Sequence, residues 1–271
     1  MTESEWLNAD DPDAMLDHLG NKGSARKLQL FAVACCGRIS PLVALNGLTD
    51  LVTMSAGFAD GSTALPDLLA ALDRELETHY GLIDLPNVDR RIIRWCNPTG
   101  DGYSYWHIDE DSETVGYYNV QFGDREYLAT VHERHVADAA LWATFLIWKD
   151  AWPVGDRSMN QAKRVAANAA FSRFHLAVRQ DSIAEQYAEL RYQCILLRHI
   201  FGNPFQPLST LLHRPLSVVG LAQALYDGLD NRLILADALE EAGCQELAEH
   251  FREEPVHPKG CWALDLILQR A

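Results

Sequence analysis

The sequence predicts a mainly α-helical fold, a multi-helix, bundle-like body with a small insertion of β-hairpin or irregular structure. Apolar residues recur at three- and four-residue spacing along most of the chain, which is the period of an amphipathic helix. Asp, Ser, Pro and Gly residues separate these stretches at positions where helices typically begin and end. The chain has 271 residues, of which 48% are apolar, so it is long enough and apolar enough to bury a sizeable core.

The first helices are each marked at their ends. Residues 10–13 (Asp-Asp-Pro-Asp) predict a helix start, because Asp caps a helix and Pro suits its first position, and Gly20 predicts the end. Ser24 predicts the start of the next helix, whose apolar face contains Leu28, Phe31, Ala32 and Cys35. We expect two further helices at residues 49–59 and 63–80.

The pattern changes after residue 80, where aromatic residues, prolines and glycines replace the leucine stripes. Residues 105–120 carry aromatic and β-branched side chains on both sides of the polar sequence Asp109-Glu110-Asp111-Ser112, which predicts a β-hairpin with an acidic tip. We therefore expect a single helical domain over residues 1–271, with an inserted aromatic segment at about residues 81–123. The candidate partner-binding residues of this insertion are Trp106, Tyr117 and Tyr118.

Helical patterns return in the second half of the chain. Residues 127–148 are apolar on most faces and predict a buried helix, whereas residues 158–200 lack Pro and Gly and predict one long helix or two nearly collinear ones. The sequence Gly202-Asn203-Pro204 predicts its end. Four shorter helices are expected at residues 216–225, 233–242, 245–252 and 262–269.

The charge balance bears on the class of partner. With 38 acidic and 23 basic side chains, the chain has a formal net charge of -15, which argues against nucleic acid as a partner because phosphates would be repelled. Residues 157–198 are locally basic, and we interpret them as a solvated helix face. Another protein is the expected partner, and the oligomeric state does not follow from the sequence.

The N-terminus and the cysteines indicate a compartment. Residues 1–13 are acidic and polar, unlike a signal peptide, and no apolar stretch reaches the ~20 residues that a membrane helix needs. We therefore expect a cytoplasmic protein with no membrane partner. The six cysteines are scattered along the chain, so in a reducing compartment they are expected to be thiols or metal ligands.

Four potential metal ligands, Cys244, His250, His257 and Cys261, lie within eighteen residues near the C-terminus. Thiolate and imidazole are the usual ligands of tetrahedral zinc, and two helices joined by a loop could bring these side chains together. Their intervals match no standard zinc finger or ribbon, so packing in the core and at helix ends remains the alternative. A nucleophilic Cys261–His257 pair is a further alternative, although no residue that would orient the histidine is evident.

Other patterns fit their motifs less well. The sequence His132-Glu133-Arg134-His135 separates its histidines by three positions, whereas the zinc-protease motif needs four. The acidic residues at 109–113 lack the alternation and the central Gly of a calcium-binding loop. Because no complete catalytic motif is found, the sequence predicts a non-enzymatic adaptor or regulatory protein without a cofactor. The alternative is a zinc-binding module or metal-dependent enzyme that uses the C-terminal Cys/His group.

Both ends of the chain resemble a known group of sequences. The N-terminus reads MTESEWLNADDPDAMLDHLGNKGSARKLQLFAVACCGRI, and the C-terminal part contains LRHIFGNPFQP, VVGLAQALYDG, LILADALEEAGC and HPKGCWALDLIL. These segments, at about residues 1–60 and 195–269, resemble an uncharacterised, paralogue-rich planctomycete-type bacterial protein family, and the LADALEEAG block is similar to its repeat-companion domain. The resemblance implies a bacterial, cytoplasmic, mostly helical protein whose motifs include the four Cys/His residues, but it implies no activity.

Overall fold

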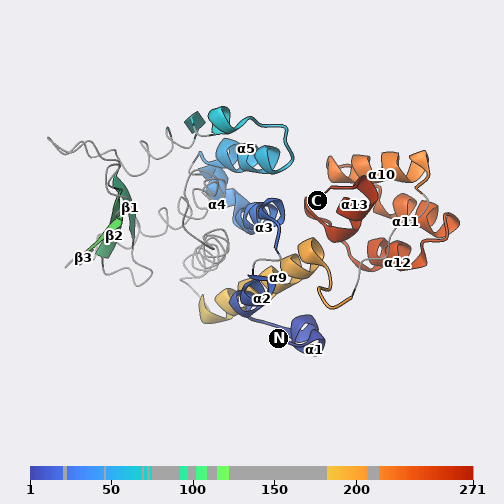
Figure 1. Cartoon of the computed structure of the whole chain (residues 1–271), viewed down its shortest axis with the longest axis horizontal. Helices are drawn as coiled ribbons and strands as arrows, with labels where there is room; N and C mark the ends of the chain where they lie inside the picture. Colours follow the sequence, from blue (N-terminus) through green and yellow to red (C-terminus); the bar gives the residue numbers. More distant parts are fainter. Residues whose placement is uncertain are drawn as a thin grey trace.

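The computed structural model describes residues 1–20, 23–45, 47–68, 70–71, 74, 92–96, 102–108, 115–121, 182–206 and 214–270. These residues form ten helices and three short strands, so the protein has the mainly α fold that the sequence predicts (Figure 1). The helices of the N-terminal half and of the middle of the chain are α1 (Glu3–Asn8), α2 (Pro12–Leu19), α3 (Ala25–Arg38), α4 (Ser40–Leu45), α5 (Thr49–Ala59) and α9 (Ser182–Phe201). The C-terminal helices are α10 (Leu216–Tyr226), α11 (Arg232–Glu241), α12 (Gln245–Glu253) and α13 (Trp262–Leu268).

The expected capping residues begin and end the helices. The Asp11 side chain accepts a hydrogen bond from the backbone N–H of Asp13 at 3.0 Å at the start of α2, and Gly20 ends that helix. Ser24 Oγ accepts from the backbone N–H of Lys27 at 3.2 Å at the start of α3. Helices α10 to α13 begin and end within one residue of the predicted positions. The described part of the predicted helix at residues 158–200 is α9, while the helix predicted at residues 127–148 lies outside the described residues.

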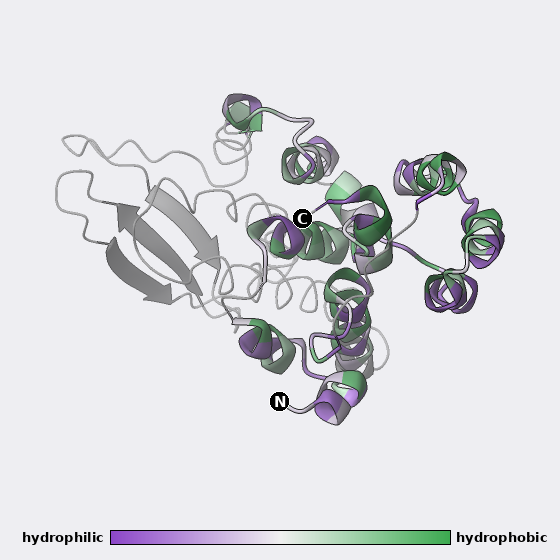
Figure 2. Cartoon of the chain, turned by 45° about the vertical axis from the view of Figure 1, so that its right-hand side comes forward, coloured by the Kyte–Doolittle hydropathy of each residue, from purple (hydrophilic) through white to green (hydrophobic). Residues whose placement is uncertain are grey.

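The buried apolar side chains form two clusters, one in each helical part of the chain. We call residues 1–74 together with 182–206 the N-terminal part, and residues 214–270 the C-terminal part. The helices of both parts are amphipathic, with hydrophobic residues along one face (Figure 2). The N-terminal cluster includes Trp6, Met15, Leu16, Phe31, Cys35, Cys194 and Ile200. The C-terminal cluster includes Val218, Ala222, Leu235, Leu239, Phe251, Cys261, Leu264 and Ile267.

Three strands lie in the middle of the sequence: β1 (Ile92–Cys96), β2 (Gly102–Ile108) and β3 (Val115–Gln121). They pair antiparallel in the order β1-β2-β3. The register places Trp106 opposite Tyr117 and Tyr105 opposite Tyr118. The residues of the expected acidic tip, and the side chains of the strands, lie outside the described part, so the insertion and its partner-binding residues stay predictions.

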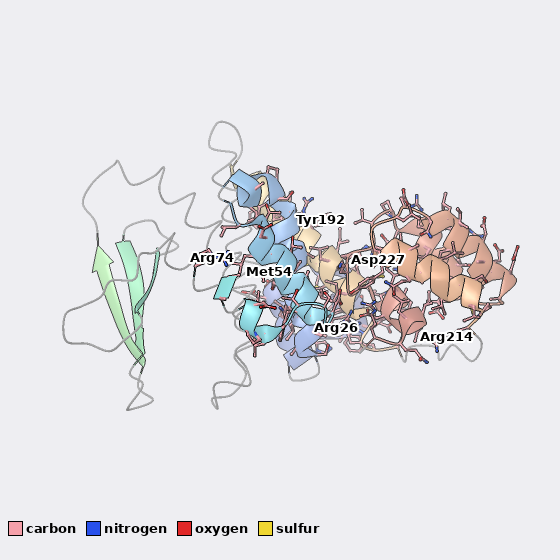
Figure 3. All side chains as sticks on the ribbon, turned by 90° about the horizontal axis from the view of Figure 1, so that it is seen from above. Arg26, Met54, Arg74, Tyr192, Arg214 and Asp227 are labelled. Atoms are coloured by element: carbon pink, nitrogen blue, oxygen red, sulfur yellow. The ribbon has the colours of Figure 1, made fainter. Side chains whose placement is uncertain are left out.

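The two helical parts meet at a polar junction that is centred on Arg26 of α3, the label between the two groups of helices in Figure 3. Its guanidinium donates to both carboxylate oxygens of Asp265 in α13, at 2.8 and 3.1 Å. It also donates to Asp60 Oδ1 at 3.1 Å and to the Tyr226 hydroxyl at 3.0 Å. Burial acts to lower the pKa of Arg26, but the hydrogen bonds to Asp265 and Asp60 outweigh this effect and raise it. The junction therefore keeps Arg26 charged.

Two glycines allow the backbones to approach closely at this junction. Gly260 has φ +83°, and a Cβ atom placed there would lie 2.8 Å from Leu30 Cδ1. Gly202 has φ +70°, and a Cβ atom there would lie 3.1 Å from the Trp262 ring. Both positions face the other helical part, so the glycines permit the contact between the parts as well as the turns.

Gly260→Ala is expected to lower the free energy of unfolding by about 1–3 kcal/mol, because the new methyl group overlaps Leu30 in a packed region. Gly243 is the matched control: its φ is +77°, but a Cβ atom there would meet nothing within 4 Å. Gly243→Ala therefore brings the same backbone strain without the overlap. Urea unfolding of both variants measures the difference in the free energy of unfolding. Equal losses for the two variants would show that the overlap with Leu30 adds no cost.

Candidate metal centre

The first residue of the site is His199, which is located in the last turn of α9 in the N-terminal part. The residues around it in the helix, Leu196, Leu197 and Ile200, are buried in the N-terminal cluster. His199 is itself only 7% exposed, so this imidazole is held at the edge of an apolar core, where its position is well defined.

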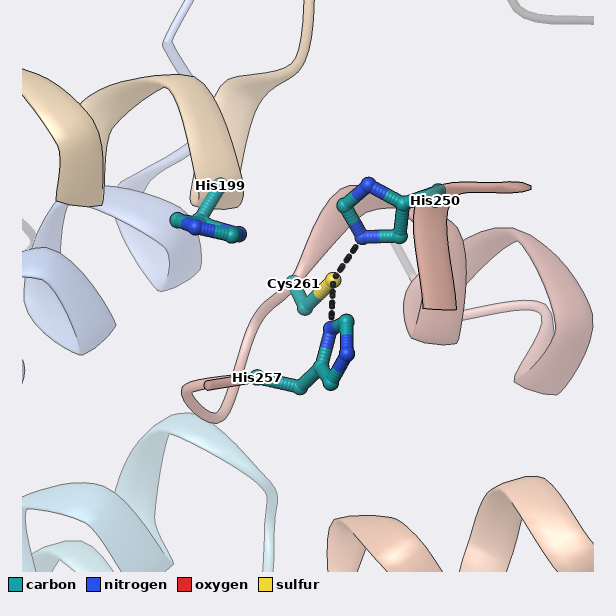
Figure 4. A group of neighbouring side chains, drawn as sticks. All are labelled: His199, His250, His257 and Cys261. Carbon is teal, nitrogen blue, oxygen red and sulfur yellow. Dashed lines mark hydrogen bonds between the residues drawn. The ribbon is translucent and has the colours of Figure 1, made fainter. Parts of the chain in front are cut away.

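The other three residues come from the C-terminal part. His250 lies in the last turn of α12, His257 lies in the loop that follows, and Cys261 is the residue directly before α13. Cys261 is fully buried. The loop turns the chain back, so that these three side chains face one another (Figure 4). Helix α9 brings His199 to the same place from the N-terminal part.

The ligand atoms of the four side chains all lie within 4.8 Å of one another. The Nε2 atom of His250 lies 3.3 Å from Cys261 Sγ, and the Nδ1 atom of His257 lies 3.8 Å from the same sulfur. Tetrahedral zinc, with bonds of about 2.0–2.1 Å to nitrogen and 2.3 Å to sulfur, holds such ligand pairs about 3.6 Å apart. The separations of the two nitrogens from Cys261 Sγ lie on either side of that value, so these two pairs are spaced as in a tetrahedral site. A bound ion would draw together the pairs of the group that lie farther apart, up to 4.8 Å.

Burial sets the protonation state of the group. Burial, followed by the neighbouring His257 and His199, lowers the pKa of His250 to about 3. Burial and the neighbouring His199 lower the pKa of His257 to about 4, and burial also lowers the pKa of His199. At neutral pH all three imidazoles are therefore neutral, which is the form that binds metal. Burial raises the pKa of the Cys261 thiol to about 11, so a bound metal would have to displace its proton.

Two nitrogen atoms of the group are buried without a partner. Within the structure as described, His199 Nδ1 and His257 Nε2 make no hydrogen bond. Buried polar atoms are nearly always paired, and a bound ion is one of the standard reasons for an exception. The Nδ1 atom of His199 is therefore an observation, independent of the ligand distances, that points to a missing ligand, whereas His257 faces Cys261 through its other nitrogen, Nδ1.

The structure replaces one member of the group that the sequence predicts. His250, His257 and Cys261 come together as expected, whereas Cys244 does not belong to the group. It stands directly before α12, and its thiol lies 3.8 Å from the Ala242 carbonyl oxygen. The fourth side chain is His199, which was not among the predicted ligands. The one local signal for it is a histidine among buried apolar residues at the end of a helix.

The remaining candidates lie elsewhere in the chain. The side chains of Trp106, Tyr117 and Tyr118, the acidic residues at 109–113 and the sequence at 132–135 lie outside the described residues. Among the helices that the structure describes, none combines the length and the apolar character needed to span a lipid bilayer.

Comparisons with known proteins leave the Cys/His group as the main guide to function. Searches against protein-family models, curated proteins and solved structures give no match to this chain.

Proposed function

We propose that this protein binds one zinc ion through His199, His250, His257 and Cys261, and that the ion has a structural role in a non-enzymatic interaction protein. The observation that carries the proposal is the convergence of four neutral or thiol ligand groups within 4.8 Å, two of them buried and two half-buried. Imidazole and thiolate ligands in a tetrahedral arrangement favour zinc over magnesium or calcium, which prefer oxygen.

A structural role is favoured because the protein supplies four ligands. Catalytic zinc sites keep one position open for water or substrate, whereas structural sites are closed by protein side chains. With all four residues bound, no position is left for a substrate. The alternative of a metal-dependent enzyme requires one of the four side chains to stay off the metal.

The ligands are divided between two helical parts with separate cores. His199 belongs to the N-terminal part, and the other three belong to the C-terminal part. A bound ion therefore adds a further link across the junction, which Arg26 with Asp265, Lys259 and Arg270 with Asp60, and the close backbone contacts already join. An ion that binds only the folded chain stabilises it by about 2.7 kcal/mol when its free concentration is 100 times its Kd.

The experiment is elemental analysis of the purified full chain, combined with thermal unfolding before and after metal removal by a chelator. We expect about one zinc per chain, and a midpoint that falls when zinc is removed and is restored when zinc is returned. Bound zinc below a tenth of an equivalent, together with a midpoint that does not respond to added zinc, would refute the proposal. A second protein that co-purifies with the zinc-loaded chain, and is lost on zinc removal, would support the interaction role.

A further inference from the structure

A carboxylate that is not one of the four proposed ligands lies beside them. Glu254 follows α12, and its Oε2 atom lies 3.3 Å from His199 Nε2. The side chain of Glu254 is 45% exposed, whereas that of His199 is 8% exposed. The carboxylate is thus partly hydrated while it contacts a buried imidazole, and it does so across the junction between the two helical parts.

The two nitrogens of His199 are in different environments. Nε2 faces the Glu254 carboxylate, and Nδ1 is buried without a hydrogen-bond partner among the described residues. A neutral imidazole carries one proton, and a carboxylate oxygen accepts a hydrogen bond from the nitrogen that carries it. A proton on Nε2 therefore leaves the lone pair of Nδ1 free to bind a metal.

We infer that Glu254 is a positioning residue of the zinc site: it accepts the Nε2–H of His199 and so directs the Nδ1 lone pair of His199 toward the ion. This inference rests on the proposed zinc binding. Histidines that bind metal commonly donate their other N–H to a carboxylate, which sets the tautomer and the ring orientation. His199 needs this support more than the other ligands, because it is the one ligand that comes from the N-terminal part.

The charge of the site supports the same role. Zinc with three neutral imidazoles and the Cys261 thiolate carries a net charge of about +1, which is costly to bury without a counter-charge. Asp265, a carboxylate whose charge also acts on Cys261, is already paired with Arg26 at 2.8 Å and lies 3.7 Å from the Lys27 ammonium. Among the carboxylates of the described residues, that of Glu254 contacts a ligand of the ion directly.

The test compares Glu254→Gln with Glu253→Gln in the full-length chain. Glu253 is the neighbouring residue, and it is exposed. Both substitutions remove one negative charge, but only the first removes the carboxylate that contacts His199. Zinc affinity is measured by competition with a chromophoric chelator, and thermal unfolding of the metal-free proteins reports on the fold.

We expect Glu254→Gln to weaken zinc binding about 10–100-fold, the usual cost of losing such a partner, while Glu253→Gln leaves it unchanged. The metal-free unfolding midpoints should be alike, which a merely structural role of Glu254 would not predict. Glu254→Asp, which keeps the charge but shortens the side chain, should fall between the two. Equal zinc affinity of the two glutamine variants would overturn the inference but leave the proposed function intact. A wild-type chain without zinc would overturn both.

Discussion

Replacing Cys261 with serine is expected to abolish stable zinc binding and the stabilisation that depends on it. The Cys261 sulfur lies 3.3 Å from His250 Nε2 and 3.8 Å from His257 Nδ1, so it is the common neighbour of two other ligands. A serine hydroxyl has nearly the same size, but it does not form the anionic sulfur ligand that zinc prefers. The unfolding free energy with zinc at 1,000 times the wild-type Kd should therefore fall by about 4 kcal/mol relative to wild type.

Cys244→Ser is the matched control for this substitution. It makes the same chemical change at a cysteine that the structure places outside the ligand group. Zinc titration and thermal unfolding, each with and without the ion, should show wild-type behaviour for Cys244→Ser. If both variants kept wild-type zinc affinity, Cys261 would not be a ligand. If only Cys244→Ser lost zinc, Cys244 and not Cys261 would be the cysteine ligand.

Replacing Arg26 with alanine is expected to destabilise the chain by about 3 kcal/mol, the lower end of the usual cost of breaking a buried ion pair. The substitution leaves Asp265 and Asp60, whose side chains are 3% and 7% exposed, without their main cation. Lys27 at 3.7 Å from Asp265 and Arg270 at 3.5 Å from Asp60 remain, so we expect the lower end of the range. Urea unfolding of the metal-free protein measures the loss.

The control for the junction is Arg252→Ala. Arg252 also pairs with two carboxylates, those of Asp237 and Glu240, but this group lies at the surface within the C-terminal part. Because exposed ion pairs are screened by water, we expect little change. Losses of the same size for the two arginine variants would contradict the importance that we assign to the junction.

The helices and part of the site could be predicted from the sequence because both depend on residues close together in the chain. Capping by Asp11 and Ser24 requires only backbone amides two or three residues away, and both caps form as predicted. His250, His257 and Cys261 lie within twelve residues, so one helix end and one loop are enough to bring them together. Cys244 is also close to these residues in the sequence, but it lies six residues before His250 at the other end of α12. Six residues along a helix correspond to a rise of about 9 Å and nearly two turns, so the helix separates the two side chains.

The sequence by itself therefore determined a mainly helical protein, its helix ends and three of the four residues in the Cys/His group. Only the tertiary structure decided that His199 is the fourth, because it lies 51 residues before His250 and arrives through the packing of α9. The same holds for Glu254 beside His199 and for Arg26 between Asp60 and Asp265. Such contacts depend on how separate apolar faces bury one another, and no local pattern of residues specifies which distant side chains then meet.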